Sequence, residues 1–320
     1  MSSHPNVTGA GYSCRWTELL VDFIEDHPQL FVLTGAGCST ASGIPDYRDD
    51  DGAWKRPQPL TYQRFVTDER ARQRYWARSL AGFRRFRVAR PNAAHEALAD
   101  LEHRGHIAEL VTQNVDGLHQ AAGSQRVIDL HGRLDTVRCL ACGERTGRDE
   151  LQIELEGRNP AFAALDAGDA PDGDADLDHV PFHTFDVPAC TACGGLLKPD
   201  VVFFGEGVPA ERVARAMAAV DRADAMLVVG SSLMVYSGYR FVRAMAEAGK
   251  PIAAINRGRT RADELLALKV ADGCADALAR LVSSLPLHHR RFKAPHPPPS
   301  ADASLARLTP PGDGSTPREG

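Results

Sequence analysis

The sequence lacks any run of the roughly 18 apolar residues that a membrane-spanning helix needs. Its first fourteen residues, Met1 to Cys14, have neither the apolar core of a secretory signal nor a basic residue, so they do not resemble a targeting peptide. A large excess of charge is also missing, because 37 basic and 42 acidic residues give a net charge of −5. These absences predict a cytoplasmic protein with no membrane or nucleic-acid partner.

Cysteine is scarce, and its odd count of seven in 320 residues argues against a disulfide framework. Four of the seven form two Cys-x-x-Cys pairs, Cys139 with Cys142 and Cys190 with Cys193, and glycine follows each pair. Four thiolates close a tetrahedron around zinc and leave no position for water, so we expect one structural zinc per chain. Buried free cysteines and a redox-active pair remain the less favoured alternatives.

Short apolar runs alternate with helical stretches along most of the chain. The expected strands are Leu30–Thr34, Leu110–Gln113, Val127–Leu130, Met226–Gly230 and Pro251–Asn256. A helix is expected at Tyr239–Ala248, ended by Gly249, which is a good cap residue. Strands interleaved with helices predict an α/β fold with a Rossmann-like parallel sheet.

Composition divides the chain into three parts. Residues 1–14 are expected to be a flexible N-terminus, and 15–285 one folded domain. Into this domain are inserted a helical segment at about 46–92, rich in Arg and aromatics, and a zinc module at about 132–199 with an acidic loop at 166–178. Residues 286–320 hold 8 of the 21 prolines and predict a disordered tail, with a basic binding tail as the alternative.

A small-residue turn follows the first expected strand. Gly35, Ala36 and Gly37 lead into a short helix at Ser39, an arrangement that lets backbone N–H groups approach a phosphate. Thr40 occupies the third glycine position of the dinucleotide fingerprint, so the pattern does not specifically support a hydride-transferring dehydrogenase. An ordinary tight turn remains the alternative.

Polar residues also end the next two expected strands. Gln113, Asn114 and Asp116 follow one of them, at the edge where α/β proteins bind ligands, although Asn and Asp also cap helices. His131 follows the other and is a candidate general base, because an imidazole has an ordinary pKa near 6.5. A zinc ligand or a structural histidine are the alternatives at this position.

Taken together, these motifs resemble the sirtuins, the NAD-dependent protein-lysine deacylases, over about residues 15–285. The matching segments are Gly35–Ser39, Gly43–Arg48, Thr112–Asp116, Leu130–Gly132, Lys198–Glu206, Gly230–Leu233 and the four cysteines. Three further segments look like class II, the branch that contains the mitochondrial lipoamidase-type sirtuin: Tyr75–Arg78, the loop at Ala170–Asp174, and Val235–Phe241.

The resemblance implies that NAD is a co-substrate consumed in each turnover, with the acyl group transferred from lysine to ADP-ribose. His131 would take a proton from the ribose hydroxyls, and Asn114 would hold the nicotinamide ribose as a second catalytic residue. The implied NAD-binding residues are Gly35, Ala36, Gly37, Ile44, Pro45, Asp46, Tyr47, Arg48, Gln113, Asn114, Val115, Asp116, Gly230, Ser231, Ser232, Asn256, Arg257, Gly258 and Cys274.

The implied partner is an acyl-lysine protein or peptide, docked as an extended strand. The residues implied for it are Val202, Phe203, Phe204, Gly205, Glu206 and Val235. Tyr75 and Arg78 resemble a pair that recognises acidic acyl groups in a related class, while an exposed helical Arg78 is the alternative. Mono-ADP-ribosyl transfer, a preference for longer or acidic acyl groups, and a non-catalytic nucleotide-binding scaffold remain the competing functions. The sequence gives no expectation for the oligomeric state.

Overall fold

The structure, a computed structural model, describes residues 13–55, 59–165, 168–169, 175–176 and 180–286. Most of the expected flexible N-terminus, of the tail and of the acidic loop therefore lies outside the described residues, while Ser13 and Cys14 begin a helix. Among the residues that are described, no helix is both long and apolar enough to cross a membrane.

A six-stranded sheet with every neighbouring pair parallel forms the centre of the fold. Its strands are β1 (Leu30–Thr34), β2 (Ile107–Thr112), β3 (Val127–Asp129), β9 (Ala225–Val229), β10 (Ile252–Ile255) and β11 (Leu268–Val270). The order β11-β10-β9-β1-β2-β3 places the switch point beside β1, between β9 and β2. Ligands of α/β proteins bind beyond the carboxyl ends of the strands at such a point. The predicted α/β fold class is thus confirmed.

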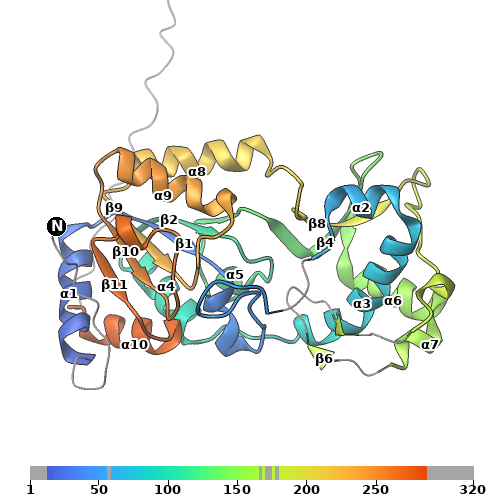
Figure 1. The fold of residues 1–320 in the computed structure, drawn as a ribbon, viewed down its shortest axis with the longest axis horizontal. Helices are drawn as coiled ribbons and strands as arrows, with labels where there is room; N and C mark the ends of the chain where they lie inside the picture. Colours follow the sequence, from blue (N-terminus) through green and yellow to red (C-terminus); the bar gives the residue numbers. More distant parts are fainter. Residues whose placement is uncertain (1–12, 56–58, 166–167, 170–174, 177–179, 287–320) are drawn as a thin grey trace, which may run out of the picture. The chain divides into compact units, whose positions relative to one another are not determined.

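The sheet is covered by helices on both faces (Figure 1). Alternate residues of β1 belong to two different cores, one on each face. Leu30 and Val32 pack in one core with the helices α1 (Ser13–Asp26), α4 (Ala93–His103) and α10 (Cys274–Ser284). Phe31 and Leu33 pack in another with α8 (Ala210–Arg222) and α9 (Tyr236–Glu247). All five residues of β1 are buried, as expected for a central parallel strand.

A second, antiparallel sheet carries the cysteine pairs. It consists of β4 (Gly132–Cys139), β5 (Arg145–Gly147) and β8 (Leu197–Val201) in the order β5-β4-β8. The remaining elements of this part are α6 (Arg148–Arg158), α7 (Pro160–Ala163), the 3₁₀ helix η4 (Phe182–Thr184), and the paired β6 (Gly168–Asp169) and β7 (Ala175–Asp176).

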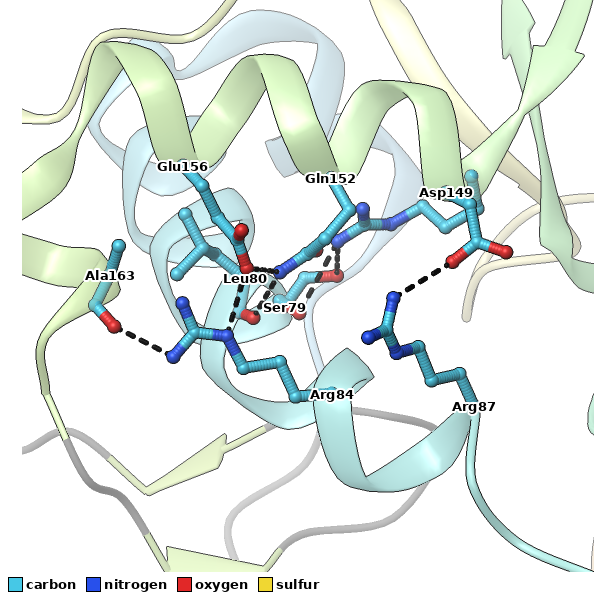
Figure 2. Close-up of polar contacts among 9 residues, drawn as sticks. Ser79, Leu80, Arg84, Arg87, Asp149, Gln152, Glu156 and Ala163 are labelled. Carbon is cyan, nitrogen blue, oxygen red and sulfur yellow. Dashed lines mark hydrogen bonds and ion pairs between the residues drawn. The ribbon is translucent and has the colours of Figure 1, made fainter.

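The helices expected between β1 and β2 are α2 (Tyr62–Thr67) and α3 (Glu69–Phe86), whereas the described part of 46–61 forms turns and isolated bridges. Aromatic side chains of α2 and α3 share one core with α6, α7 and Phe185. Figure 2 shows the polar contacts along this α3–α6 interface. Arg84 of α3 donates to Glu156 (2.9 Å) and to the carbonyl of Ala163 (2.6 Å), and Gln152 of α6 donates to the carbonyl of Leu80 (2.9 Å). These contacts tie the helical insertion to the cysteine-bearing module.

Candidate active site

The small-residue turn lies at the switch point, directly after β1. It forms the 3₁₀ helices η1 (Ala36–Cys38) and η2 (Thr40–Ser42). The N–H of Gly37 donates to the carbonyl of Gly230 at the end of β9 (2.9 Å), which holds the turn against the neighbouring strand end. Backbone of two adjacent strand ends therefore forms one wall of the site.

Asn114 is a buried link between this turn and the end of β2. Its amide donates to the carbonyl of Gly35 (3.1 Å) and to the hydroxyl of Ser39 (3.0 Å). The Ser39 hydroxyl in turn donates to Asp116 (2.7 Å), whose other carboxylate oxygen accepts from the N–H of Leu118 (2.9 Å) at the start of α5 (Leu118–Ala121). Asp116 thus accepts from the first N–H of α5, although the N-cap residue is Gly117, and it also joins the polar network of the site.

His131, two residues after the end of β3, is hydrogen-bonded at both of its ring nitrogens. Nδ1 lies 2.9 Å from the carbonyl of Gln113, and because a carbonyl only accepts, Nδ1 carries the proton. Nε2 therefore has the lone pair and accepts from the hydroxyl of Ser237 (2.8 Å). Desolvation by burial, helped by Arg212 and Arg240, lowers the pKa of His131 to about 4. The imidazole is neutral at pH 7, the form that a general base requires.

A cavity of about 1530 Å³ opens beside these residues. It exceeds the roughly 300–1,000 Å³ typical of a pocket for one small ligand, so it has room for a dinucleotide and a second substrate. All the NAD-binding, catalytic and peptide-binding residues implied by the resemblance line this cavity, except two. The exceptions are Gly35 and Asp116. Gly35 accepts a hydrogen bond from Asn114, and Asp116 accepts one from Ser39.

The segment expected to surround nicotinamide, which begins at Ile44, lies along the cavity. Several of its side chains contact one another or its own backbone. Arg48 donates to the carbonyl of Gly52 (2.7 Å), and its guanidinium lies 3.9 Å from the ring centroid of Trp54. Asp46 forms an ion pair with Lys55 (2.5 Å). The ring of Trp54 also contacts Phe204, with centroids 5.5 Å apart. This segment therefore bridges the proposed NAD and peptide sites.

The residues expected to hold the adenosine half lie at the ends of β10 and β11. Asn256 follows β10, and its amide donates to the carbonyl of Gly258 (2.9 Å). Cys274 begins α10, and burial raises the pKa of its thiol to about 12, so it stays uncharged. Both residues line the same cavity as His131.

The segment expected to pair with substrate continues from β8 and begins beside the candidate base. The N–H of Val202 donates to the carbonyl of His131 (2.7 Å). Glu206 accepts from the N–H of Phe203 (2.8 Å) and pairs with the buried Lys198 (3.1 Å), which also donates to the carbonyl of Val201. The N–H of Glu206 also donates to the carbonyl of Phe203 (3.0 Å), so residues 203–206 form a turn along the cavity.

The Tyr75–Arg78 pair, on α3, lines the cavity as well. Tyr75 packs against Phe65 and Phe203, with ring centroids 5.5 Å and 5.2 Å apart. Arg78 is half-buried, so the alternative of an exposed helical arginine is wrong. Arg74, which also lines the cavity, was not expected there.

The four paired cysteines come together at one end of the β5-β4-β8 sheet. Their sulfur atoms all lie within 4.8 Å of one another, with Cys139 and Cys193 at 3.5 Å and Cys142 and Cys190 at 3.8 Å. A zinc ion with Zn–S bonds of about 2.3 Å needs sulfurs about 3.8 Å apart, so the cluster fits one structural zinc. Gly143 (φ +78°) and Gly194 (φ +73°) supply the left-handed residue that ends each turn. His131 is not part of this cluster, so its alternative role as a zinc ligand is wrong.

A second group of buried side chains lies behind the small-residue turn. Cys38, His95 and His119 have ligand-type atoms within 4.8 Å of one another. Two of their ring nitrogens have partners: Nε2 of His119 lies 2.9 Å from the hydroxyl of Thr34, and Nδ1 of His95 accepts from the N–H of Asn92. Nδ1 of His119 is buried without a hydrogen-bond partner among the described residues. Burial lowers the pKa of His119 to about 3, so this imidazole is neutral.

Sequence reasoning left two polar residues of the site without a role. Ser39 and Ser237 both stood inside the motifs quoted for the resemblance, yet their partners, Asn114 and His131, are distant in sequence. Only the fold shows which hydroxyl meets which group.

A comparison with protein-family models matches residues 35–237 to the Sir2 family. Among curated relatives, a protein of Xanthomonas campestris pv. campestris (strain 8004) named NAD-dependent protein deacetylase is 68% identical over 262 residues, which is 82% of this chain and 89% of that relative. NAD-dependent protein deacetylase 2 of Bradyrhizobium diazoefficiens is 64% identical over 263 residues, 82% of this chain and 96% of that relative.

The solved structures that this chain resembles are also Sir2 proteins. The structure described as "Sir2-p53 peptide-NAD+" aligns with a TM-score of 0.68 at 30% identity, over 83% of this chain and 97% of its own. Another, described as "Structural Basis for the Mechanism and Regulation of Sir2 Enzymes", aligns with a TM-score of 0.66 at 30% identity.

Proposed function

Because the chain belongs to the Sir2 family, we propose that it is an NAD-dependent protein-lysine deacetylase, as its relatives are named. The observation that carries this function is the single cavity shared by the small-residue turn, the neutral imidazole of His131 and the segment 202–206. One cavity thus holds a candidate phosphate site, a candidate base and a candidate peptide strand.

NAD, as co-substrate, supplies an activated bond between ribose and nicotinamide and accepts the acyl group. We assign the pyrophosphate to the turn at Ala36 and Gly37, and the nicotinamide ribose to Gln113 and Asn114. These assignments are the ones that the resemblance to sirtuins implies, and the backbone and amide groups that line the cavity there are compatible with them.

His131 acts as the general base in this proposal. Its Nδ1 proton is engaged by Gln113, so Nε2 is the atom that receives the proton of a ribose hydroxyl. Because the imidazole is neutral well below pH 7, the base is ready without prior deprotonation.

The peptide would pair through its backbone with the segment Val202–Glu206, with Val235 on the other side. Backbone pairing reads little sequence, so selectivity would reside in the acyl pocket near Tyr75 and Arg78. An acetyl group agrees with the names of the relatives, which do not favour the ADP-ribosyltransferase alternative. A preference for acidic or longer acyl groups, the class II assignment and the cytoplasmic location stay predictions.

The experiment that tests this function is an acyl panel. The purified chain is mixed with NAD and acetyl-, glutaryl- or lipoyl-lysine peptides, and products are measured by mass spectrometry. We expect nicotinamide, free lysine peptide and O-acyl-ADP-ribose in equal amounts, with acetyl-lysine consumed. No turnover of any acyl chain would reject the proposal, and label from NAD bound covalently to protein would favour ADP-ribosyl transfer.

A further inference from the structure

The lone pair of the candidate base is occupied by another side chain of the same protein. Nε2 of His131 accepts from the hydroxyl of Ser237 at 2.8 Å, in the first turn of α9. Neutral imidazole has one lone pair, and the carbonyl of Gln113 requires the proton to be on Nδ1. In this arrangement, the basic atom of His131 is reached through the Ser237 hydroxyl.

The contact is built into the fold and does not depend on a mobile side chain alone. Gly238 packs so closely on Gln113 that a Cβ there would lie 2.4 Å from its Nε2. The side chain of Gln113 is also held by the hydroxyl of Ser231 (2.7 Å), while its carbonyl holds His131. Residues at the start of α9, Gln113 after β2 and His131 after β3 thus contact one another around the imidazole.

Ser237 is also open to a substrate. It is half-buried and lines the same cavity as His131, so a substrate bound in that cavity can reach its side chain. A serine hydroxyl that donates to Nε2 keeps lone pairs with which it can accept a hydrogen bond from a second hydroxyl. A hydroxyl 2.8 Å from a base oriented by a third group is the arrangement found where enzymes move a proton through serine.

We propose that Ser237 is a catalytic residue that relays a proton from a ribose hydroxyl of NAD to His131, an inference that rests on the proposed deacetylase function. The ribose O–H bond breaks as that proton joins Oγ of Ser237. The proton of Ser237 passes at the same time to Nε2 of His131. The ribose oxygen becomes the nucleophile, serine is unchanged, and His131 becomes an imidazolium that later returns its proton.

The test compares Ser237→Ala and Ser237→Thr with the wild-type chain in two reactions. Deacetylation of an acetyl-lysine peptide needs the relay. Exchange of labelled nicotinamide into NAD, with the same peptide bound, breaks and remakes only the bond to ribose and needs no proton acceptor. Ser237→Ala should lower the kcat of deacetylation by about tenfold or more, with KM for NAD and the exchange rate within about twofold. Threonine keeps the hydroxyl and should restore most of the rate.

Two further readouts separate a relay from a structural effect. In mixtures of light and heavy water, a plot of the wild-type kcat against the fraction of heavy water should be curved, because two protons are transferred. The same plot for Ser237→Ala should be a straight line, because one proton is transferred. In the free protein, nitrogen-15 resonances of His131 should show that Nε2 loses a hydrogen-bond donor in Ser237→Ala and keeps it in Ser237→Thr. The resonance is assigned with a His131→Gln variant.

Ser283→Ala is the matched control, because Ser283 is exposed on α10 and donates only to the carbonyl of Ala279 (2.8 Å). It should leave both reactions and the His131 resonances unchanged. An unchanged or faster deacetylation in Ser237→Ala, with a linear dependence on heavy water in the wild type, would overturn the relay. A wild-type chain that neither deacetylates nor exchanges would instead remove the proposed function.

Discussion

Single residues decide the chemistry of this site, and His131 is the first to test. His131→Ala should lower the kcat of deacetylation by about 100-fold or more, because it removes the general base. NAD affinity should stay within about twofold, since the proposal places the ring at the ribose and the pyrophosphate at the turn. Steady-state kinetics and calorimetric titration with NAD measure the two effects.

The exposed His183 offers a matched control, because His183→Ala removes an imidazole outside the cavity. Unimpaired turnover in the His131 variant would show that another group accepts the proton.

The protonation state of the same imidazole gives a second prediction. Burial lowers the pKa of His131 from 6.5 to about 4, and only the neutral ring accepts a proton. The acid limb of the kcat/KM profile should therefore have its midpoint near pH 4 to 5, well below the pH 6.5 of an exposed imidazole. Initial rates in overlapping buffers from pH 4 to 8 check this, and a midpoint above pH 6 would contradict the buried environment.

At the residue scale, the sequence predicted the residues that line the site better than it predicted the hydrogen bonds between them. Asn114 and His131 were identified because each directly follows an apolar strand in a parallel sheet. Their partners, Ser39 and Ser237, could not be assigned, because a hydroxyl gives no periodic or spacing signal. The contact between His131 and Ser237 joins residues 106 apart in the chain.

Among the elements, the β5-β4-β8 sheet depends on the cysteine cluster. Cys139→Ser should reduce zinc from about one ion per chain to well below one and should lower the thermal stability, because a structural metal contributes directly to folding. Elemental analysis of the folded fraction and thermal unfolding measure this. Full stability and an unchanged His131 site in a metal-free chain would show that the thiols pack well enough alone.

Element boundaries were predictable where the pattern was strong. Leu30–Thr34 is expected and observed with the same bounds, because five buried residues run between polar or turn-forming neighbours. The strand β11 was missed, since Leu268–Val270 has three residues with Lys269 at its centre. Its pairing with β10, and the ion pair of Lys269 with Asp263 of η5 (Asp263–Leu265), come from tertiary structure.

For the molecule as a whole, buried neutral histidines predict how stability depends on pH. The pKa of His119 is about 3 and that of His131 about 4 in the folded state, against about 6.5 when unfolded. Between these values the unfolded chain binds more protons than the folded chain, so stability falls as pH decreases from 6.5 toward 4. The melting temperature should drop by more than about 5 °C between pH 7 and pH 5.

Calorimetry of the ligand-free chain at fixed ionic strength checks this slope. His119→Gln, which cannot bind a proton, should flatten it even if the variant is less stable throughout. A slope that stays the same in that variant would assign the acid sensitivity to other groups.

The arrangement of the whole chain was only partly accessible from sequence. Interleaved strands and helices predicted the parallel sheet. The order of the strands in that sheet could be read only from the structure. The domain limits at 15–285 stay a prediction, with the expected tail outside the described residues.

The strand β4 has a practical consequence for anyone handling this protein. It starts at Gly132, next to the imidazole, and ends at the thiolate of Cys139, while its neighbour β8 leads into the segment proposed for the peptide. A chelating buffer or an oxidant that removes zinc from the four cysteines would therefore destabilise the segments around His131, although it does not bind in the cavity. Preparations that look inactive for want of the right acyl group should first be assayed for their metal content.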